Sequence, residues 1–476
     1  MRILTFYKFI KERTKLSYFL LSLVISFVLF GWTVKYGFFF SDDFTWIWHG
    51  SRIANGELSA LTAHMSTFYS PVLNYFYAFM GLVFGLKAGW YFLFGILVSV
   101  FTAFFVGLLV YKMTKSSFVG FVGVALCALV GGTYEPLIWI GANMHSITAL
   151  FMVISTFALL SAYQKTPRVV WWLILSFVTL VLALATKEVA VVLPVILFFI
   201  AVPYLLKEKR SFFYLKNVLY WLATSAISII YVVQQYLWQR DSIWVTQEVW
   251  KFSPSSLIRL PIILLDAFIP LKNIISSQNA IVYFVITLCL FIYSIYKFRN
   301  NKIMYIGLFW AVMTILPVVF FKTAVWWELL PSRYMYNVRI GMIIFVSAII
   351  VELFSDLKKK KFAYSLSVFL LITSFFQTIA MFETVKKEYI YVYQTGRSLY
   401  QISLTLHEVQ PSKVVVHWHG PFNNNHAHMV GAFAVISNIP EEKIVFLNKN
   451  DNYELKSNEV LLGWDDKTET YFLTKN

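Results

Sequence analysis

The sequence is 476 residues long, 59% hydrophobic and only 13% charged, and its mean hydropathy is +0.67. Soluble domains carry about 25% charged residues, so these values exclude an ordinary soluble protein. The formal net charge of +16 does not indicate nucleic-acid binding, because the basic residues fall in short clusters between apolar runs. Such clusters orient a membrane chain and meet anionic lipid head groups. The two cysteines, Cys127 and Cys289, lie inside apolar runs, which excludes a disulfide framework or a thiolate metal site.

Apolar runs of about 17 to 25 residues recur between residues 16 and 383, and each can cross a bilayer as a helix. The first follows the basic segment FYKFIKERTK. It is too long for a signal peptide and no small-residue cleavage site follows it, so we expect a retained first span. We predict about eleven spans, near 16–36, 90–111, 117–133, 145–163, 169–186, 189–206, 213–235, 279–297, 303–321, 338–354 and 363–383.

Residues 71–86 decide the orientation of the chain. This run is apolar, but it is short and begins with a proline. If it does not span, every basic cluster between spans falls on the same side as the basic N-terminus. We therefore expect an interfacial helix at 71–86, a cytoplasmic N-terminus and an extracytoplasmic C-terminal segment. Residues 255–275 predict a second interfacial element, because two prolines and an aspartate interrupt them.

The first outer loop, residues 37–89, opens with GFFFSDDFTWIWHG. Its adjacent carboxylates, Asp42 and Asp43, repel one another and lose hydration among aromatic side chains, which indicates a functional role. His64 and Tyr69 lie in the same loop, and each alone also fits a structural role.

Further polar residues are expected on the outer face. Lys187 and Glu188 separate two apolar runs with almost no loop, as a tight turn with its own ion pair or as a lysine aimed at an anionic group. Arg333 and Arg339 lie at an outer helix boundary, where arginine either reaches toward head groups or binds phosphate in a bidentate manner. His145 joins this set, with a structural role as its alternative.

These residue types suit a substrate with an anionic head and an apolar tail, such as a sugar on a lipid phosphate. Lys187 and Arg333 would stabilise the phosphate leaving group. Asp42 or Asp43 would deprotonate the acceptor hydroxyl, and the other carboxylate would orient the acceptor or hold a divalent cation, Mg²⁺ or Mn²⁺.

Five landmarks in order between about residues 38 and 345 resemble the GT-C superfamily of membrane glycosyltransferases, which use polyprenyl-phosphate sugars. The resemblance extends to the protein O-mannosyltransferases and to bacterial relatives of the tetratricopeptide-associated O-mannosyltransferases. The matching segments are SDDFTWI, YSPVLNYFYAFMGLVFGLKAGWY, EPLIWIGANMHSITALF, ATKEVAVVLP and SRYMYNVRIG. Thr186 stands where the family has serine, and Ser332 stands where it has an acid.

The resemblance implies a GT-C fold and inverting transfer of mannose or another hexose to a hydroxyl, with a protein, glycan or glycolipid as acceptor. It implies Asp42 as base with Asp43 beside it, Lys187, Arg333 and Arg339 at the donor phosphate, and Glu135, Glu188 and Tyr334 among the other substrate contacts. It also implies an enzyme of the bacterial plasma (inner) membrane and cell envelope, or of the endoplasmic reticulum. A lipid-linked glycan flippase or exporter, and an oligosaccharide ligase or polymerase, are the alternative functions.

The domain prediction is a transmembrane catalytic domain at 1–383 and a small extracytoplasmic α/β domain at 384–476. The fold class is thus an all-α polytopic membrane protein with an α/β appendage. The second domain is expected to hold a helix near 395–409, a strand at 413–419, a helix near 427–437, and strands at 443–447, 459–464 and 469–474. His417 and His419 share one face of the first strand, so they are candidate metal ligands, glycan contacts or plain loop residues.

Overall fold

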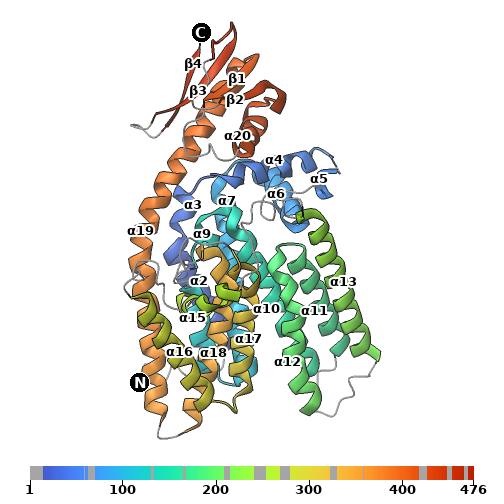
Figure 1. The fold of residues 1–476 in the computed structure, drawn as a ribbon, viewed down its shortest axis with the longest axis vertical. Helices are drawn as coiled ribbons and strands as arrows, with labels where there is room; N and C mark the ends of the chain where they lie inside the picture. The colour runs from blue at the N-terminus through green and yellow to red at the C-terminus, as the bar shows by residue number, and fades with distance from the viewer. Residues whose placement is uncertain are drawn as a thin grey trace. The chain divides into compact units, whose positions relative to one another are not determined.

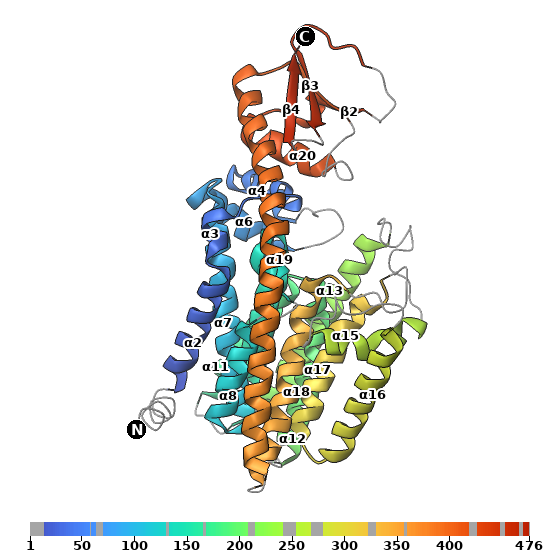
Figure 2. The same ribbon diagram turned by 90° about the vertical axis from the view of Figure 1, so that its left-hand side faces the viewer.

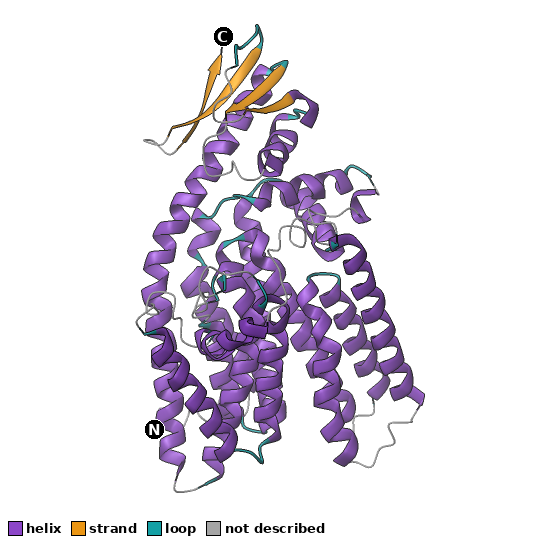
Figure 3. Cartoon of the chain, viewed as in Figure 1, coloured by secondary structure: helices purple, strands orange, loops and turns teal. Residues whose placement is uncertain are grey.

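A computed structural model describes residues 14–57, 59–62, 70–129, 133–164, 168–207, 215–240, 254–267, 279–321, 330–356, 359–417, 426–447, 453–465 and 470–475. Helices dominate these ranges, and strands occur near the C-terminus together with a small helical segment (Figure 3). The chain divides into two compact units. The first holds residues 1–29, 95–137 and 142–382, and the second holds residues 30–94, 138–141 and 383–476.

Every predicted span falls on a helix of the structure. The helices are α2 (Thr14–Phe30), α7 (Ala88–Thr114), α8 (Ser117–Ala128), α10 (Asn143–Tyr163), α11 (Val169–Leu184), α12 (Leu193–Lys207), α13 (Leu215–Gln239), α16 (Ala280–Lys297), α17 (Lys302–Val319), α18 (Met335–Ser355) and α19 (Lys360–Val409). Within the described ranges, seven helices are long and apolar enough to cross a membrane, and the others are shorter apolar helices. The chain is an integral membrane protein.

The first unit has a core of buried helices and a periphery of exposed apolar helices. Most of the apolar stretch of α7, α10 and α18 is buried, whereas α13, α16 and the first part of α19 are largely exposed. These helices are labelled in Figure 1. Exposed apolar side chains on these last helices suit the hydrocarbon region of a bilayer. Short elements complete the unit: α9 (Glu135–Ile138), η2 (Glu188–Val192), η3 (Pro254–Arg259), α15 (Leu260–Asp266) and η4 (Ser332–Tyr334).

The second unit contains the first outer loop as a set of short helices. They are α3 (Trp32–Tyr36), α4 (Asp42–Ala54), α5 (Ser59–Thr62) and α6 (Pro71–Phe84). The α6 helix has 14 residues. At about 1.5 Å per residue it is too short for a hydrocarbon core of about 30 Å, in keeping with the predicted interfacial helix. Helices α4 and α6 pack so closely at Gly50 that a Cβ atom there would lie 2.6 Å from the Tyr77 carbonyl carbon.

The C-terminal segment forms a four-stranded mixed sheet with strand order β2-β1-β3-β4. Strand β1 (Lys413–His417) pairs in parallel with β2 (Ile444–Leu447) and β3 (Glu459–Asp465), and β4 (Thr470–Lys475) is antiparallel to β3. Helix α20 (His426–Ala432) and a π-helical turn (Phe433–Ser437) lie between β1 and β2 in the chain, and η7 (Glu441–Lys443) precedes β2. The predicted strands and the predicted helix near 427–437 are therefore present.

The helix expected near 395–409 is not a separate element. It is the last part of α19, a 50-residue helix that starts as a membrane span and runs without a break to the sheet (Figure 2). The domain boundary predicted at residue 383 falls inside this helix. Gly396 lies where α19 meets the first loop, and a Cβ atom there would overlap the carbonyl oxygen of Phe39.

Candidate active site

The carboxylate pair lies in the first turn of α4, which begins at Asp42. A helix N-terminus presents unpaired N–H groups and a partial positive charge, so acidic side chains are favoured there. Ser41, just before the pair, has φ +50° and ψ −128°. Residues other than glycine rarely adopt this conformation, and such strain concentrates at functional sites.

Asp43 is held from two directions by backbone N–H groups. Its side chain is fully buried, Phe40 N–H donates to Oδ2 at 3.1 Å, and Gly141 N–H donates to Oδ1 at 2.6 Å. Burial raises the pKa of the Asp43 carboxyl well above its usual range, while the two backbone hydrogen bonds act in the opposite direction because they favour the charged form. Asp43 therefore joins the start of α4 to the segment that ends at Gly141.

Asp42 has a different environment. It is only half-buried, and the Ser41 hydroxyl donates to its Oδ1 at 3.4 Å. A carboxylate that exchanges protons with a substrate must be reachable, and Asp42 meets this condition where Asp43 does not. We call Asp42, Asp43 and the two backbone donors of Asp43 the acidic cluster.

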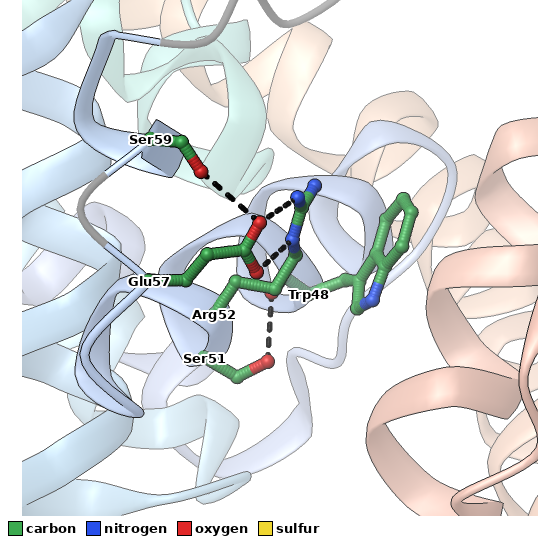
Figure 4. A network of polar contacts seen from close by, with 5 residues as sticks. All are labelled: Trp48, Ser51, Arg52, Glu57 and Ser59. Atoms are coloured by element: carbon green, nitrogen blue, oxygen red, sulfur yellow. Dashed lines mark hydrogen bonds and ion pairs between the residues drawn. The ribbon is translucent and has the colours of Figure 1, made fainter.

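Contacts along α4 hold the acidic cluster in place. Trp46 stacks on Tyr77 of α6, with ring centroids 5.6 Å apart. At the other end of the helix, Arg52 forms an ion pair with Glu57, and its guanidinium lies 5.4 Å from the ring centroid of Trp48 (Figure 4). The hydrogen bond with Arg52 keeps the pKa of Glu57 below its usual value. These contacts tie the turn after α4 back to the helix.

A second group of charged residues lies in the first unit, around Arg333. Arg333 Nη1 donates to Glu135 Oε2 at 2.9 Å, and the backbone N–H of Glu135 donates to the Ser332 hydroxyl at 3.2 Å. The two bonds join α9 to η4. Ser332, which replaces a family acid, is thus a hydrogen-bond acceptor, and Glu135 supplies a carboxylate beside Arg333.

His145 and Tyr334 complete this group. Their rings meet edge to face with centroids 5.2 Å apart, and the Arg333 guanidinium lies 5.1 Å from the ring centroid of Tyr334. The charges of Lys187 and Arg333 both act on His145, which is 3% exposed. We call Glu135, His145, Lys187, Glu188, Arg333 and Tyr334 the cation cluster.

Lys187 is almost fully buried, and its Nζ lies 2.9 Å from Glu188 Oε1. The ion pair expected for a tight turn is therefore present, at the start of η2. Thr186, at the position of the family serine, donates its hydroxyl to the carbonyl oxygen of Leu182 at 2.6 Å.

Arg339 is not part of the cation cluster. It is 2% exposed, and its guanidinium donates to the carbonyl oxygens of Leu126 and Ala267 at distances between 2.8 and 3.3 Å. These bonds join α18 to α8 and to the residue after α15. The guanidinium is thus enclosed and bonded to main-chain carbonyls, and the donor-phosphate role of Arg339 stays a prediction.

Four predicted residues are outside this description. His64, Tyr69 and His419 lie outside the described residues, and so does the side chain of His417, at the end of β1. Among the described residues, no three His, Cys, Asp or Glu side chains group as metal ligands. A divalent cation at Asp42 and Asp43 stays a prediction.

Sequence reasoning missed the partners of Asp43, the backbone N–H groups of Phe40 and Gly141. The segment EPLIWIGANMHSITALF includes Gly141, but main-chain donors have no residue-type signature. The glycine is the one available hint, since a Cβ atom at Gly141 would lie 3.2 Å from Asp43 Oδ1.

No protein-family model matches the sequence, and no curated protein does. Among solved structures, ArnT from Cupriavidus metallidurans bound to undecaprenyl phosphate superposes with a TM-score of 0.53 at 12% identity, over 94% of this chain and 92% of that one. The archaeal oligosaccharyltransferase AglB from Archaeoglobus fulgidus, in complex with an inhibitory peptide and a dolichol-phosphate, matches with a TM-score of 0.53 at 12% identity. The chain has the GT-C fold.

The GT-C similarity covers most of the chain but not all of every neighbour. The match to AglB covers 91% of this chain and 65% of that protein, so this chain spans about two thirds of the length of AglB. The apo form of the Archaeoglobus fulgidus oligosaccharyltransferase gives a TM-score of 0.55 at 13% identity, over 90% of this chain and 64% of that one. The fold expected from the sequence motifs is thereby confirmed.

Proposed function

We propose that the protein is an inverting glycosyltransferase. It moves a sugar from a polyprenyl-phosphate donor to a hydroxyl acceptor at the outer face of the membrane. The observation that carries this proposal is the division of the carboxylate pair into a reachable Asp42 and a buried Asp43 bonded to two backbone N–H groups. Two GT-C neighbours contain a polyprenyl-phosphate lipid in their structures, which supports the donor class.

In this proposal Asp42 is the general base. It takes the proton of the acceptor hydroxyl while the acceptor oxygen bonds to the anomeric carbon of the sugar from the side opposite the phosphate. The bond between that carbon and the phosphate oxygen breaks, and its electron pair leaves with the lipid phosphate. Asp43 is a positioning residue, because its two oxygens are engaged by the main chain.

The cation cluster binds the leaving group. A developing phosphate dianion needs fixed positive charge, which Lys187 and Arg333 supply. Glu135 and Glu188 hold the two cations in place through ion pairs. A guanidinium carries five N–H donors in a planar fork that suits a phosphate, so one bond to a carboxylate does not exhaust it. His145 and Tyr334 pack beside Arg333 and fix its environment.

The proposed sugar is mannose or another hexose, and the proposed location is the plasma membrane of a bacterial cell envelope. A Mg²⁺ or Mn²⁺ ion at Asp42 and Asp43 stays a prediction. The similarity to an oligosaccharyltransferase favours a second candidate, transfer of a whole oligosaccharide from a lipid diphosphate. The flippase alternative would require translocation without transfer.

The test uses the purified full-length chain with radiolabelled polyprenyl-phosphate mannose and a mixed pool of membrane and peptide acceptors. We expect Asp42→Asn to lower the transfer rate about 10²- to 10⁴-fold with donor affinity unchanged, because only the proton acceptor is lost. Arg333→Ala should weaken donor binding as well. Asp356→Asn, with the same chemical change at the end of α18, serves as the matched control and should transfer normally.

The variant Asp43→Asn tests whether Asp43 acts as a positioning residue and not as the base. We expect it to lower both the transfer rate and the melting temperature, because one backbone donor would face an amide NH₂ group in place of an oxygen. Full activity of Asp42→Asn would overturn the base assignment. Transfer from an oligosaccharide diphosphate but from no monosaccharide phosphate would establish the second candidate.

A further inference from the structure

A groove of about 440 Å³ lies in the second unit and includes no residue of the acidic or the cation cluster. Its walls come from three stretches of chain: residues 34–38 at the end of α3, residues 86–93 at the start of α7, and Arg397 on α19. Sites for small ligands typically measure about 300–1,000 Å³, so the groove is large enough for the head group of a lipid.

The groove is rimmed by cations. Lys35 and Lys87 are exposed, and Arg397 is half-buried. Arg397 donates to the Tyr36 carbonyl oxygen at 2.7 Å and lies 5.5 Å from the ring centroid of Phe38, so its charged end is fixed at the groove. Among the described residues, no carboxylate lines the groove and none pairs with these three cations.

The position of the groove in the chain places it at a membrane surface. Residues 32–36 end the first predicted span, and a long apolar helix starts at Ala88. Tyr36 and Trp90 are 44% and 46% exposed, as expected for aromatic side chains at the level of the head groups. Apolar residues line the groove beside the cations, among them Val34, Leu86 and Leu93. The lining is therefore both cationic and apolar.

We propose that this groove binds the phosphate head group of an anionic phospholipid of the surrounding membrane. The lysines and the arginine contact the phosphate, and the apolar residues contact the start of the acyl chains. Charge complementarity identifies the occupant, because three cations without a carboxylate favour an anion and the mixed lining favours an amphiphile. Lysines that only reach toward the lipid surface would not require a groove or a fixed arginine.

The test is native mass spectrometry of the full-length chain in a neutral detergent, titrated with phosphatidylglycerol or phosphatidylcholine. We expect wild type to bind phosphatidylglycerol about tenfold more tightly than phosphatidylcholine. The double variant Lys35→Gln/Lys87→Gln should lose about tenfold in affinity for phosphatidylglycerol. Lys443→Gln/Lys475→Gln removes the same charge from exposed lysines of the C-terminal segment and should bind like wild type.

Three results would overturn the proposal. These are equal affinity of wild type for the two lipids, unchanged affinity in Lys35→Gln/Lys87→Gln, and an equal loss in the control variant, which would indicate a general charge effect. Competition by inorganic phosphate at millimolar concentration would assign the groove to a soluble anion in place of a lipid. The measurement needs no sugar transfer, so it stands or falls independently of the proposed function.

Discussion

His49 is a buried base on the helix that carries the acidic pair. It is 3% exposed, and its Nε2 atom has no hydrogen-bond partner among the described residues. Burial lowers its pKa from the usual value of 6.5, because the charged form loses its hydration. The folded protein therefore holds His49 neutral at a pH where an unfolded chain already binds a proton.

This difference predicts a pH dependence of stability. As the pH falls through about 6.5, the unfolded state takes up a proton that folded His49 does not, so the free energy of unfolding decreases. Between pH 7.5 and 5.5 we expect the melting temperature of wild type to decrease relative to that of His49→Gln, which cannot be protonated at this position. Differential scanning fluorimetry in detergent measures both slopes.

The comparison of wild type with His49→Gln isolates the effect of His49, because the buried carboxyl of Asp43 is present in both proteins. The raised pKa of Asp43 acts in the opposite direction, since the folded state then binds more protons than the unfolded state as the pH rises above about 4. That contribution is the same in wild type and in His49→Gln, and cancels in the difference. Parallel slopes for the two proteins would rule out a contribution from His49.

At the scale of elements, the bridge between α9 and η4 gives a second prediction. We expect Arg333→Lys to lower kcat/KM for the donor about tenfold or more, because an ammonium group cannot offer a planar fork to both Glu135 and a phosphate. Glu135→Gln should lower it by a similar factor. The double variant Glu135→Gln/Arg333→Lys should lose less kcat/KM than the sum of the two single losses, when each is expressed as a free energy. The difference is the coupling energy, which we expect to be about 0.5–3 kcal/mol.

Donor kinetics of wild type, the two single variants and the double variant give this coupling energy directly. Additive losses, within about 0.3–0.5 kcal/mol, would mean that Glu135 and Arg333 act independently. Asp356→Asn is again a suitable control for the assay, because Asp356 lies at the other end of α18 from Arg333.

Much of the arrangement of elements could be predicted from the sequence, since an apolar run of sufficient length has few alternatives to a membrane helix. The strands of the C-terminal segment could also be predicted, because short β-branched runs such as KVVVH end at polar turns. The continuous α19 could not be predicted, because the change from apolar to polar composition near residue 383 indicates a domain boundary and does not show that the helix continues across it.

The candidate site could be predicted only as a set of residues. The carboxylate pair and the buried lysine can be recognised in the sequence, because charged residues are costly near lipid and therefore rare between apolar runs. Their partners depend on tertiary structure: the main-chain donors of Asp43 and the carbonyl acceptors of Arg339 leave no trace in residue type. The different surroundings of two adjacent aspartates follow from the direction of each side chain on α4, which the sequence order does not show.

For the whole molecule, the charge distribution predicts an orientation. The basic connection after α16 should face the cytoplasm, and the C-terminal sheet should lie outside. With Cys289 replaced by alanine, a cysteine at Ser457 should react with a membrane-impermeant maleimide in intact cells. A cysteine at Asn300, equally exposed in the structure, should react only after the cells are permeabilised.

The remaining cysteine does not interfere, because Cys127 is buried. Labelling of the Asn300 position alone in intact cells would reverse the predicted orientation and would move the proposed reaction to the other side of the membrane. Labelling of both positions would contradict the prediction as well, because it would place both on the outer side. Labelling is scored on the full-length chain by a gel shift, with the cysteine-replaced parent as the blank.

The segment from Glu135 to Gly141 contributes one contact to the cation cluster and one to the acidic cluster. Its first residue bonds to Arg333, and its last donates to Asp43. Only five residues separate these two contacts along the chain. A deletion or an insertion within this segment should therefore disturb the hydrogen bonding of both clusters at once.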